Sequence, residues 1–363
     1  MSNSTKQSAA SPHNHHHHRP KSVFRIEFEY FWFRFFRALL RLLPLKLAYP
    51  LARTLGTIGY YFAEKRRTRT IQHLMHAGLA RDRKSAAKLA RQVARQFAMF
   101  GVEIFKKDQC FDLGKVTLTG DAETIRRCFG HDGRPGEQNF ILITAHYGSW
   151  ELSGGAIAAL AGRHLVSLMR KFSNPKIGEE ILRIRRSPEH ELVDKQGGIR
   201  TVLRALRGGK NIAILPDQHA SHRDGVEGTF FGQPCRTHSS PALLHLKTGV
   251  PILPEVARRL PGDDCRFEID VAPLIVYRPT GDTAHDVAVL TQRCNDALEK
   301  LIRKDPTQWL WAHRRWLNIN REQKNPQISP KAIEICGKTD YITASAQLQT
   351  TPGKGRPVPE AVK

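Results

Sequence analysis

The stretch ITAHYGSWEL, residues 143–152, holds a histidine and a carboxylate at a spacing that suits proton transfer. A carboxylate bonded to one ring nitrogen of His146 fixes the tautomer and raises the basicity of the other nitrogen, which makes a general base for a hydroxyl group. Glu151 stands five residues on, and positions five apart on one continuous helix point away from each other. The two side chains therefore meet only if His146 lies in a turn and Glu151 in the first turns of the following helix.

Two ordinary interpretations stand beside this catalytic one. A histidine next to an apolar run is often a core residue with satisfied nitrogens, and Glu151 could be a simple charge at a helix N-terminus. Gly148 permits a tight turn and SWELSGGAIAAL then begins a helix, so the sequence favours a strand–turn–helix unit. The amides exposed at the start of that helix could hold a developing oxyanion.

The segments around this unit alternate between strand and helix from about residue 115 onward. We predict short apolar strands at 139–145, 164–169, 211–216, 250–257 and 266–277. Helices are predicted at about 151–161, 176–186, 196–207, 239–248 and 284–303. This alternation predicts an α/β fold with a mainly parallel central sheet covered by helices. His146 then falls at the C-terminal end of a central strand, where such folds place their sites.

Further candidates follow the ends of other predicted strands. Arg170 ends one strand in VSLMRKFSNP, and Asp217 ends another in ILPDQHASHRDG. We assign substrate binding to Arg170, Asn174, Asp217 and Arg314. Arg170 could instead be a surface ion-pair partner, and Asp217 after a proline could be a turn residue.

Residues 24–62 form the most apolar segment of the chain, but basic residues interrupt it and two prolines break it, so it is no clean membrane span. A helix predicted over 24–43 carries one polar stripe, made of Glu27, Tyr30, Arg34, Arg37 and Arg41, with aromatics and leucines around it. This is typical of a helix that lies in a lipid interface with its arginines at the phosphates; a core helix of a soluble domain is the alternative.

These patterns divide the chain into four parts. We predict a disordered tail over 1–22, a membrane-anchoring helical segment over 23–62, a catalytic domain over 63–320 that begins with basic helices, and a disordered tail over 321–363.

The net charge of +23 points towards phosphates, on nucleic acid or on anionic lipid, and residues 1–110 carry most of it. The sequence has no zinc finger, RNA-recognition signature or convincing helix-turn-helix, which disfavours a nucleic-acid binder, and no G-x-S-x-G, which disfavours a serine hydrolase. The six cysteines show no metal-like spacing, so we expect reduced thiols in a cytosol-facing protein and no metal. A non-catalytic membrane-binding protein stays an alternative.

Several motifs in order carry a family resemblance: the H-x4-E of His146 and Glu151, LPDQ at 215–218, TFFG at 229–232 and QWLWAHRRW at 308–316. Together with the arginine-rich apolar N-terminal helix, they resemble the lipid A biosynthesis acyltransferases of the lauroyl/myristoyl type. That family lies within the H-x4-D/E glycerolipid acyltransferases. The resemblance covers roughly residues 24–318, so the domain over 63–320 is expected to be an acyltransferase domain.

The resemblance implies a role for each matching residue. His146 would be the base that deprotonates an acceptor hydroxyl, Glu151 its orienter, Arg170 a phosphate-binding or charge-stabilising residue, and Asp217 a support from the next strand end. The donor would be an acyl thioester of acyl carrier protein or coenzyme A, with no cofactor, metal or acyl-enzyme. The acceptor would be a lipid A precursor in lipopolysaccharide biosynthesis. The expected location is the cytoplasmic face of the inner membrane, as a peripheral or single-pass protein on anionic lipids.

The sequence departs from the family pattern in two places. His219 and His222 follow the PDQ motif where acidic or glycine residues are more usual, and RTIQHL at 69–74 stands where an Asn-Leu pair is usual. These departures bear on the acceptor, so another glycolipid or a phospholipid remains an alternative to lipid A.

Overall fold

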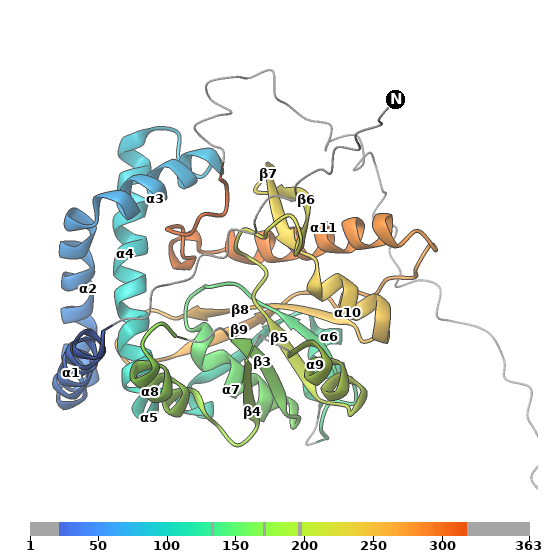
Figure 1. The fold of residues 1–363 in the computed structure, drawn as a ribbon, viewed down its shortest axis with the longest axis horizontal. Coiled ribbons are helices and arrows are strands. Elements are labelled where there is room, and N and C mark those ends of the chain that lie inside the picture. The colour runs from blue at the N-terminus through green and yellow to red at the C-terminus, as the bar shows by residue number, and fades with distance from the viewer. Residues whose placement is uncertain (1–21, 132–133, 170–171, 195–197, 318–363) are drawn as a thin grey trace, which may run out of the picture. The chain divides into compact units, whose positions relative to one another are not determined.

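A computed structural model describes residues 22–131, 134–169, 172–194 and 198–317 (Figure 1). The tails predicted over 1–22 and 321–363 lie outside these residues, apart from Ser22, which caps the first helix. Arg170 lies outside them as well.

One mainly parallel sheet of seven strands forms the centre of the described part of the chain. In sheet order the strands are β1 (Val116–Gly120), β9 (Phe267–Val271), β8 (Ile252–Arg259), β2 (Ile141–Ile143), β5 (Asn211–Ile214), β3 (Leu165–Met169) and β4 (His190–Asp194). All neighbours are parallel except β8 and β9. The predicted fold class is therefore confirmed. A separate antiparallel hairpin consists of β6 (Gly225–Phe230) and β7 (Gln233–His238).

Helices cover both faces of this sheet because successive residues of a strand point to opposite sides. Ile141 and Ile143 belong to a core formed with α9 (Gly198–Arg207), α10 (Ser240–Thr248) and α11 (Thr283–Ile302). Leu142 belongs to the opposite core, formed with α6 (Ala122–Phe129) and α7 (Trp150–Ala161). Strands buried on both faces need continuous apolar runs, and FILITA supplies one at β2.

The N-terminal part adds a layer of helices to this core. It contains α1 (Val23–Leu42), α2 (Leu45–Phe62), α3 (Glu64–His76) and α4 (Arg83–Phe105), and α2 lies beside α4 (Figure 1). Gly56 allows that close approach, since a Cβ there would lie 2.7 Å from the Ala94 carbonyl oxygen. Among the described residues, none of the helices is both long and apolar enough for a bilayer crossing.

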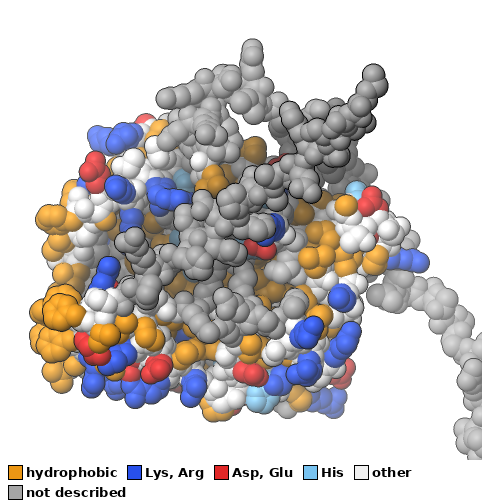
Figure 2. Space-filling view, viewed as in Figure 1, with side chains coloured by type: hydrophobic (Ala, Val, Ile, Leu, Met, Phe, Trp, Pro, Cys, Tyr) orange, Lys and Arg blue, Asp and Glu red, His pale blue; other side chains and the backbone are white. Residues whose placement is uncertain are grey.

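The outer faces of α1 and α2 carry many exposed apolar side chains. They are Val23, Phe24, Phe28, Phe31, Trp32, Phe35, Phe36, Leu39 and Leu42 on α1, and Leu47, Leu51, Leu55, Ile58, Tyr61 and Phe62 on α2. Figure 2 shows apolar side chains gathered at its left edge, over these two helices. We call this set the apolar face.

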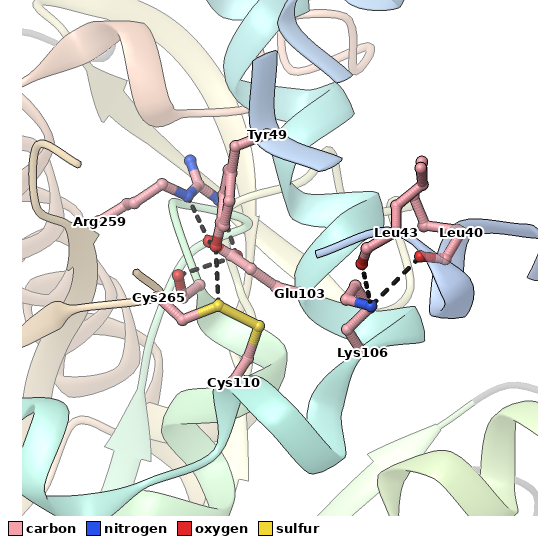
Figure 3. The surroundings of a disulfide bond; sticks show 9 residues. Leu40, Leu43, Tyr49, Glu103, Lys106, Cys110, Arg259 and Cys265 are labelled. Carbon is pink, nitrogen blue, oxygen red and sulfur yellow. Dashed lines mark hydrogen bonds and ion pairs between the residues drawn. A yellow bond between two sulfur atoms is a disulfide. The ribbon is translucent and has the colours of Figure 1, made fainter. Parts of the chain in front are cut away.

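Part of the polar stripe of α1 contacts other helices, while Arg34 of the stripe is exposed. Arg37 pairs with Glu180 of α8 (Pro175–Arg185), and Arg41 pairs with Asp108 of α5 (Lys107–Cys110) at 2.5 Å. Lys106 also binds the end of α1: its Nζ donates to the carbonyls of Leu40 and Leu43 at 3.2 and 2.8 Å (Figure 3). It donates to the Arg41 carbonyl as well, at 3.0 Å. Arg37 and Arg41 therefore attach α1 to its neighbouring helices.

The cysteines also differ from the prediction. A disulfide joins Cys110 to Cys265, which lies 155 residues later (Figure 3), so these two are not reduced thiols. Cys128, Cys235 and Cys294 are free, and Cys336 lies outside the described residues. Sequence spacing gave no sign of the pair because tertiary contacts bring α5 to the loop before β9.

A buried ion pair joins α4 to the sheet. Glu103 and Arg259 are 1% and 6% exposed, and the Arg259 guanidinium donates to both carboxylate oxygens of Glu103 (Figure 3). The hydroxyls of Tyr49 and Ser149 donate to the same carboxylate at 3.2 and 2.9 Å. Ser149 precedes α7, so this pair supports the turn between β2 and α7.

We expect Arg259→Met to destabilise the protein by about 3–5 kcal/mol, because it leaves a buried carboxylate without its charge partner. Arg258→Met is the matched control: its partner Glu268 is on the same sheet, but Arg258 is 34% exposed, and such pairs contribute about 0–1 kcal/mol. Urea unfolding of both variants checks this. An equal loss of unfolding free energy in the two variants would show that the buried pair does not anchor α4.

Candidate active site

His146 and Asp217 meet at the C-terminal edge of the sheet because their strands are parallel neighbours. Ile143 of β2 pairs with Ile214 of β5, and each candidate lies three residues beyond its paired isoleucine. The Asp217 carboxylate accepts from the backbone N–H of His146 through Oδ2 and contacts the ring Nδ1 through Oδ1, both at 2.9 Å. The strand-end position predicted for both residues is confirmed.

The segment 308–313 closes over this pair. The Trp309 indole Nε1–H donates to Asp217 Oδ2 at 2.9 Å, and the backbone N–H of Leu310 donates to the His146 carbonyl at 3.0 Å. The Asp217 side chain is 0% exposed, whereas the His146 side chain is 22% exposed. The carboxylate is thus sealed inside while part of the imidazole reaches the surface.

The electrostatics of the pair fix the tautomer of His146. Burial alone would raise the pKa of Asp217, but the facing imidazole and the hydrogen bonds hold it well below its usual range. Burial would lower the pKa of His146, but the Asp217 charge overcomes this, so the pKa is raised from its usual value. An ionised carboxylate only accepts hydrogen bonds, so Nδ1 carries the proton and Nε2 carries the lone pair. This is the form that a general base requires.

Gln218 and His313 complete the site, and sequence reasoning did not assign either to it. The Gln218 amide nitrogen lies 3.1 Å from His146 Nε2 and 3.3 Å from His313 Nε2. The two imidazole rings are 4.9 Å apart, and burial lowers the pKa of His313 to about 4, which keeps it neutral. A substrate hydroxyl that reaches His146 Nε2 must take the place of the Gln218 amide.

Glu151 lies in the first turn of α7, as the strand–turn–helix prediction requires, but it does not make the orienting contact. Its carboxylate pairs with Arg185 of α8, whose backbone carbonyl accepts from Lys107 Nζ at 2.9 Å. Glu151 acts on His146 only through its charge, which favours the protonated ring. The structure therefore gives the orienting contact to Asp217 instead of Glu151.

Among the described residues, the other two candidates, Asn174 and Arg314, form no hydrogen bond with the His146–Asp217 pair. Asn174 caps the N-terminus of α8, and its amide donates to the Ile26 carbonyl at 2.9 Å and to Glu29 at 3.1 Å, which ties α8 to α1. Arg314 is exposed.

The neighbour of Arg314 has a clearer place in the site. Arg315 is 0% exposed, and its guanidinium donates to the Gln218 carbonyl at 3.0 Å and to Thr237 Oγ1 at 2.7 Å. It thereby holds the PDQ segment in position.

The fold and site define an α/β protein with a His–Asp pair at neighbouring strand ends, in which the carboxylate is buried and the imidazole is partly exposed. Residues 18–318 match the family model described as bacterial lipid A biosynthesis acyltransferase, so the chain belongs to that family and the predicted family is confirmed.

Two curated relatives are similar over about half of the chain. A phosphatidylinositol mannoside acyltransferase of Mycobacterium tuberculosis (strain CDC 1551 / Oshkosh) is 26% identical over 192 residues, which are 52% of this chain and 58% of the relative. A lipid A biosynthesis acyltransferase of Haemophilus influenzae is 24% identical over 196 residues, which are 53% of this chain and 60% of the relative. The chain thus spans less than two thirds of the length of either relative.

Asp217→Asn is expected to lower the pKa of His146 below its wild-type value, because the neutral amide no longer favours the charged ring. Glu151→Gln removes a charge that does not contact the ring, so it should lower the pKa of His146 less. NMR of the histidine rings across a pH titration measures the pKa of His146 in both variants. A wild-type pKa in Asp217→Asn would contradict the assigned contact.

Proposed function

We propose that this protein transfers a fatty acyl group from a thioester to a hydroxyl of a glycolipid acceptor. The observation that carries the proposal is the contact of the buried Asp217 carboxylate with His146, which leaves Nε2 of a partly exposed imidazole as the acceptor of a proton. In the reaction His146 Nε2 takes the hydroxyl proton while the oxygen attacks the thioester carbon. The new ester C–O bond forms, the C–S bond breaks, and the proton passes from His146 to the departing thiolate. Asp217 stabilises the imidazolium that forms between these steps.

The acceptor class follows from the names of the relatives. Phosphatidylinositol mannoside and lipid A are both sugar-bearing lipids, and we infer a glycolipid of this kind, with a lipid A precursor as the first candidate. Acyl carrier protein and coenzyme A are the two candidate donors, because both present the acyl chain on the same phosphopantetheine thiol.

We also propose that the apolar face docks on a membrane, at the cytoplasmic side of the inner membrane. Its aromatics suit the headgroup–acyl boundary, and the basic N-terminal part suits anionic lipid. Arg34 is exposed beside these aromatics, with its guanidinium over the Tyr30 ring at 5.8 Å. The docked arginines Arg37 and Arg41 contribute less, because carboxylates already neutralise them.

His146→Ala should reduce transfer from an acyl thioester to a glycolipid by about 10²- to 10⁴-fold, the usual contribution of a general base. Mass spectrometry of the acylated product with purified protein in mixed micelles measures the rate. His285→Ala is the control, since His285 is exposed at the start of α11.

A His146→Ala protein that keeps near-normal activity would refute the catalytic assignment. A wild-type protein that binds membranes but never acylates any lipid hydroxyl would favour the non-catalytic alternative instead.

Replacing Phe31, Trp32, Phe35 and Phe36 together with Ser should release the protein from anionic vesicles at low salt, because salt does not screen apolar burial. Vesicle flotation measures binding. Replacing Leu243 and Val276 with Ser gives a control, since both are exposed apolar residues outside the apolar face. Retained binding by the quadruple variant, with circular dichroism unchanged, would exclude α1 as the docking surface.

A further inference from the structure

A cavity of about 530 Å³ lies between α2, α3 and α4, and one of its ends reaches the segment 310–313. Small residues of α2 and α4 form much of its lining, including Gly56, Gly59, Ala94 and Ala98. Its surface is mainly apolar, and its volume lies within the usual range for small-molecule sites, about 300–1,000 Å³. We call this cavity the α2–α4 groove.

The groove leads to the His146–Asp217 pair. His313 lines one end of the groove, and its ring is 4.9 Å from that of His146. A small recess beside it is lined by His146 and Trp150, and Val93, Phe97 and Leu310 line both the recess and the groove. The recess therefore adjoins the groove, with these three residues between or beside the two spaces.

Three arginines of α3, Arg66, Arg67 and Arg69, stand along the rim of the groove. Arg69 donates to the Ala312 carbonyl at 3.0 Å and Arg67 donates to the Tyr61 carbonyl at 2.8 Å, which fixes both beside the opening. Arg66 is exposed. An apolar interior with a basic rim complements a ligand that has one hydrocarbon chain and an anionic group.

We propose that the α2–α4 groove holds the hydrocarbon chain of the acyl donor, and that the surface at Gly59 sets how long that chain can be. This inference rests on the proposed transfer reaction, because it places the thioester carbon beside His146 and His313. The rim arginines then face the phosphate of the donor's phosphopantetheine arm. Both candidate donors carry that phosphate.

The donor fits the groove better than the acceptor does. A glycolipid keeps its chains in the bilayer, and moving them from one apolar medium to another yields little free energy. The donor chain has no such medium once it leaves its carrier, so burying it in the groove is favourable. One groove of this volume also suits one chain, whereas lipids carry two or more.

Gly59 is the position where chain length can be set. Gly59 is an exposed residue of the groove lining, and a Cβ built there has no atom within 4 Å, so a larger side chain has room at this position. Gly56, one turn earlier, has no such room, because its Cβ would meet α4. Gly101 of α4 also has no atom within 4 Å of a built Cβ, and it does not line the groove, which makes it a matched control.

The test compares Gly59→Ala, Gly59→Leu and Gly101→Leu with saturated acyl thioesters of increasing length. Each methylene kept out of an apolar site weakens binding by about fourfold. We expect Gly59→Leu to lower kcat/KM for the longest donor that the wild type accepts by roughly tenfold or more relative to a short donor. Gly59→Ala should shift the profile less, and Gly101→Leu should keep the wild-type profile. An unchanged profile in Gly59→Leu would overturn the proposal, as would a changed KM for the acceptor with no change for the donor.

A second measurement separates this inference from the proposed reaction. In the His146→Ala background, cis-parinaric acid serves as a fluorescent single-chain probe, and its binding needs no turnover. Gly59→Leu should weaken binding by at least fivefold while Gly101→Leu leaves it unchanged. If this pattern holds but the wild type transfers no acyl group, the chain-binding role of the groove is supported and the proposed transfer reaction is refuted. Equal probe binding in all variants would refute the groove as a chain site.

Discussion

The hydrogen-bonded contact between the Asp217 carboxylate and His146 is the interaction on which the site depends. An ionised carboxylate with no exposed surface is costly unless hydrogen bonds replace water. Here the His146 backbone N–H, its ring Nδ1–H and the Trp309 indole all donate to it. Two of these donors belong to His146, just after β2, and the third belongs to Trp309 in the segment 308–313. The parallel pairing of β2 with β5 and the closure by residues 308–313 are both needed to keep this charge buried.

The sequence supports the strand-end placement of His146 and Asp217 because apolar runs and their spacing reveal parallel strands. It could not choose the partner of His146. A five-residue spacing shows that Glu151 can approach the ring, but Arg185 comes from α8, 34 residues later, and takes that carboxylate. Gln218 and His313 are 95 residues apart and meet only through the tertiary fold. Their motifs were visible as PDQ and WAHRRW, but no local pattern showed that they share one site.

The N-terminal helices show again that a local sequence pattern does not reveal contacts between separate elements. Amphipathic spacing predicted the helix over 24–43 and its aromatic surface, both of which the structure contains as α1. The spacing could not show that Glu180 and Asp108 would face Arg37 and Arg41, since those acids lie in other helices. The disulfide between Cys110 and Cys265 could not be predicted for the same reason, because the two cysteines lie 155 residues apart. Periodicity describes one element at a time, whereas ion pairs and disulfides depend on which elements become neighbours.

The pH dependence of acyl transfer tests the central claim most directly, because it reports the protonation of the working base. His146 must be neutral to accept a proton, so kcat/KM should fall as the pH drops through its raised pKa. In Asp217→Asn that pKa is lower, so the acid limb should move to lower pH while the maximal rate also falls. An acid limb that stays in place in Asp217→Asn, or activity that does not depend on pH in this range, would contradict the account.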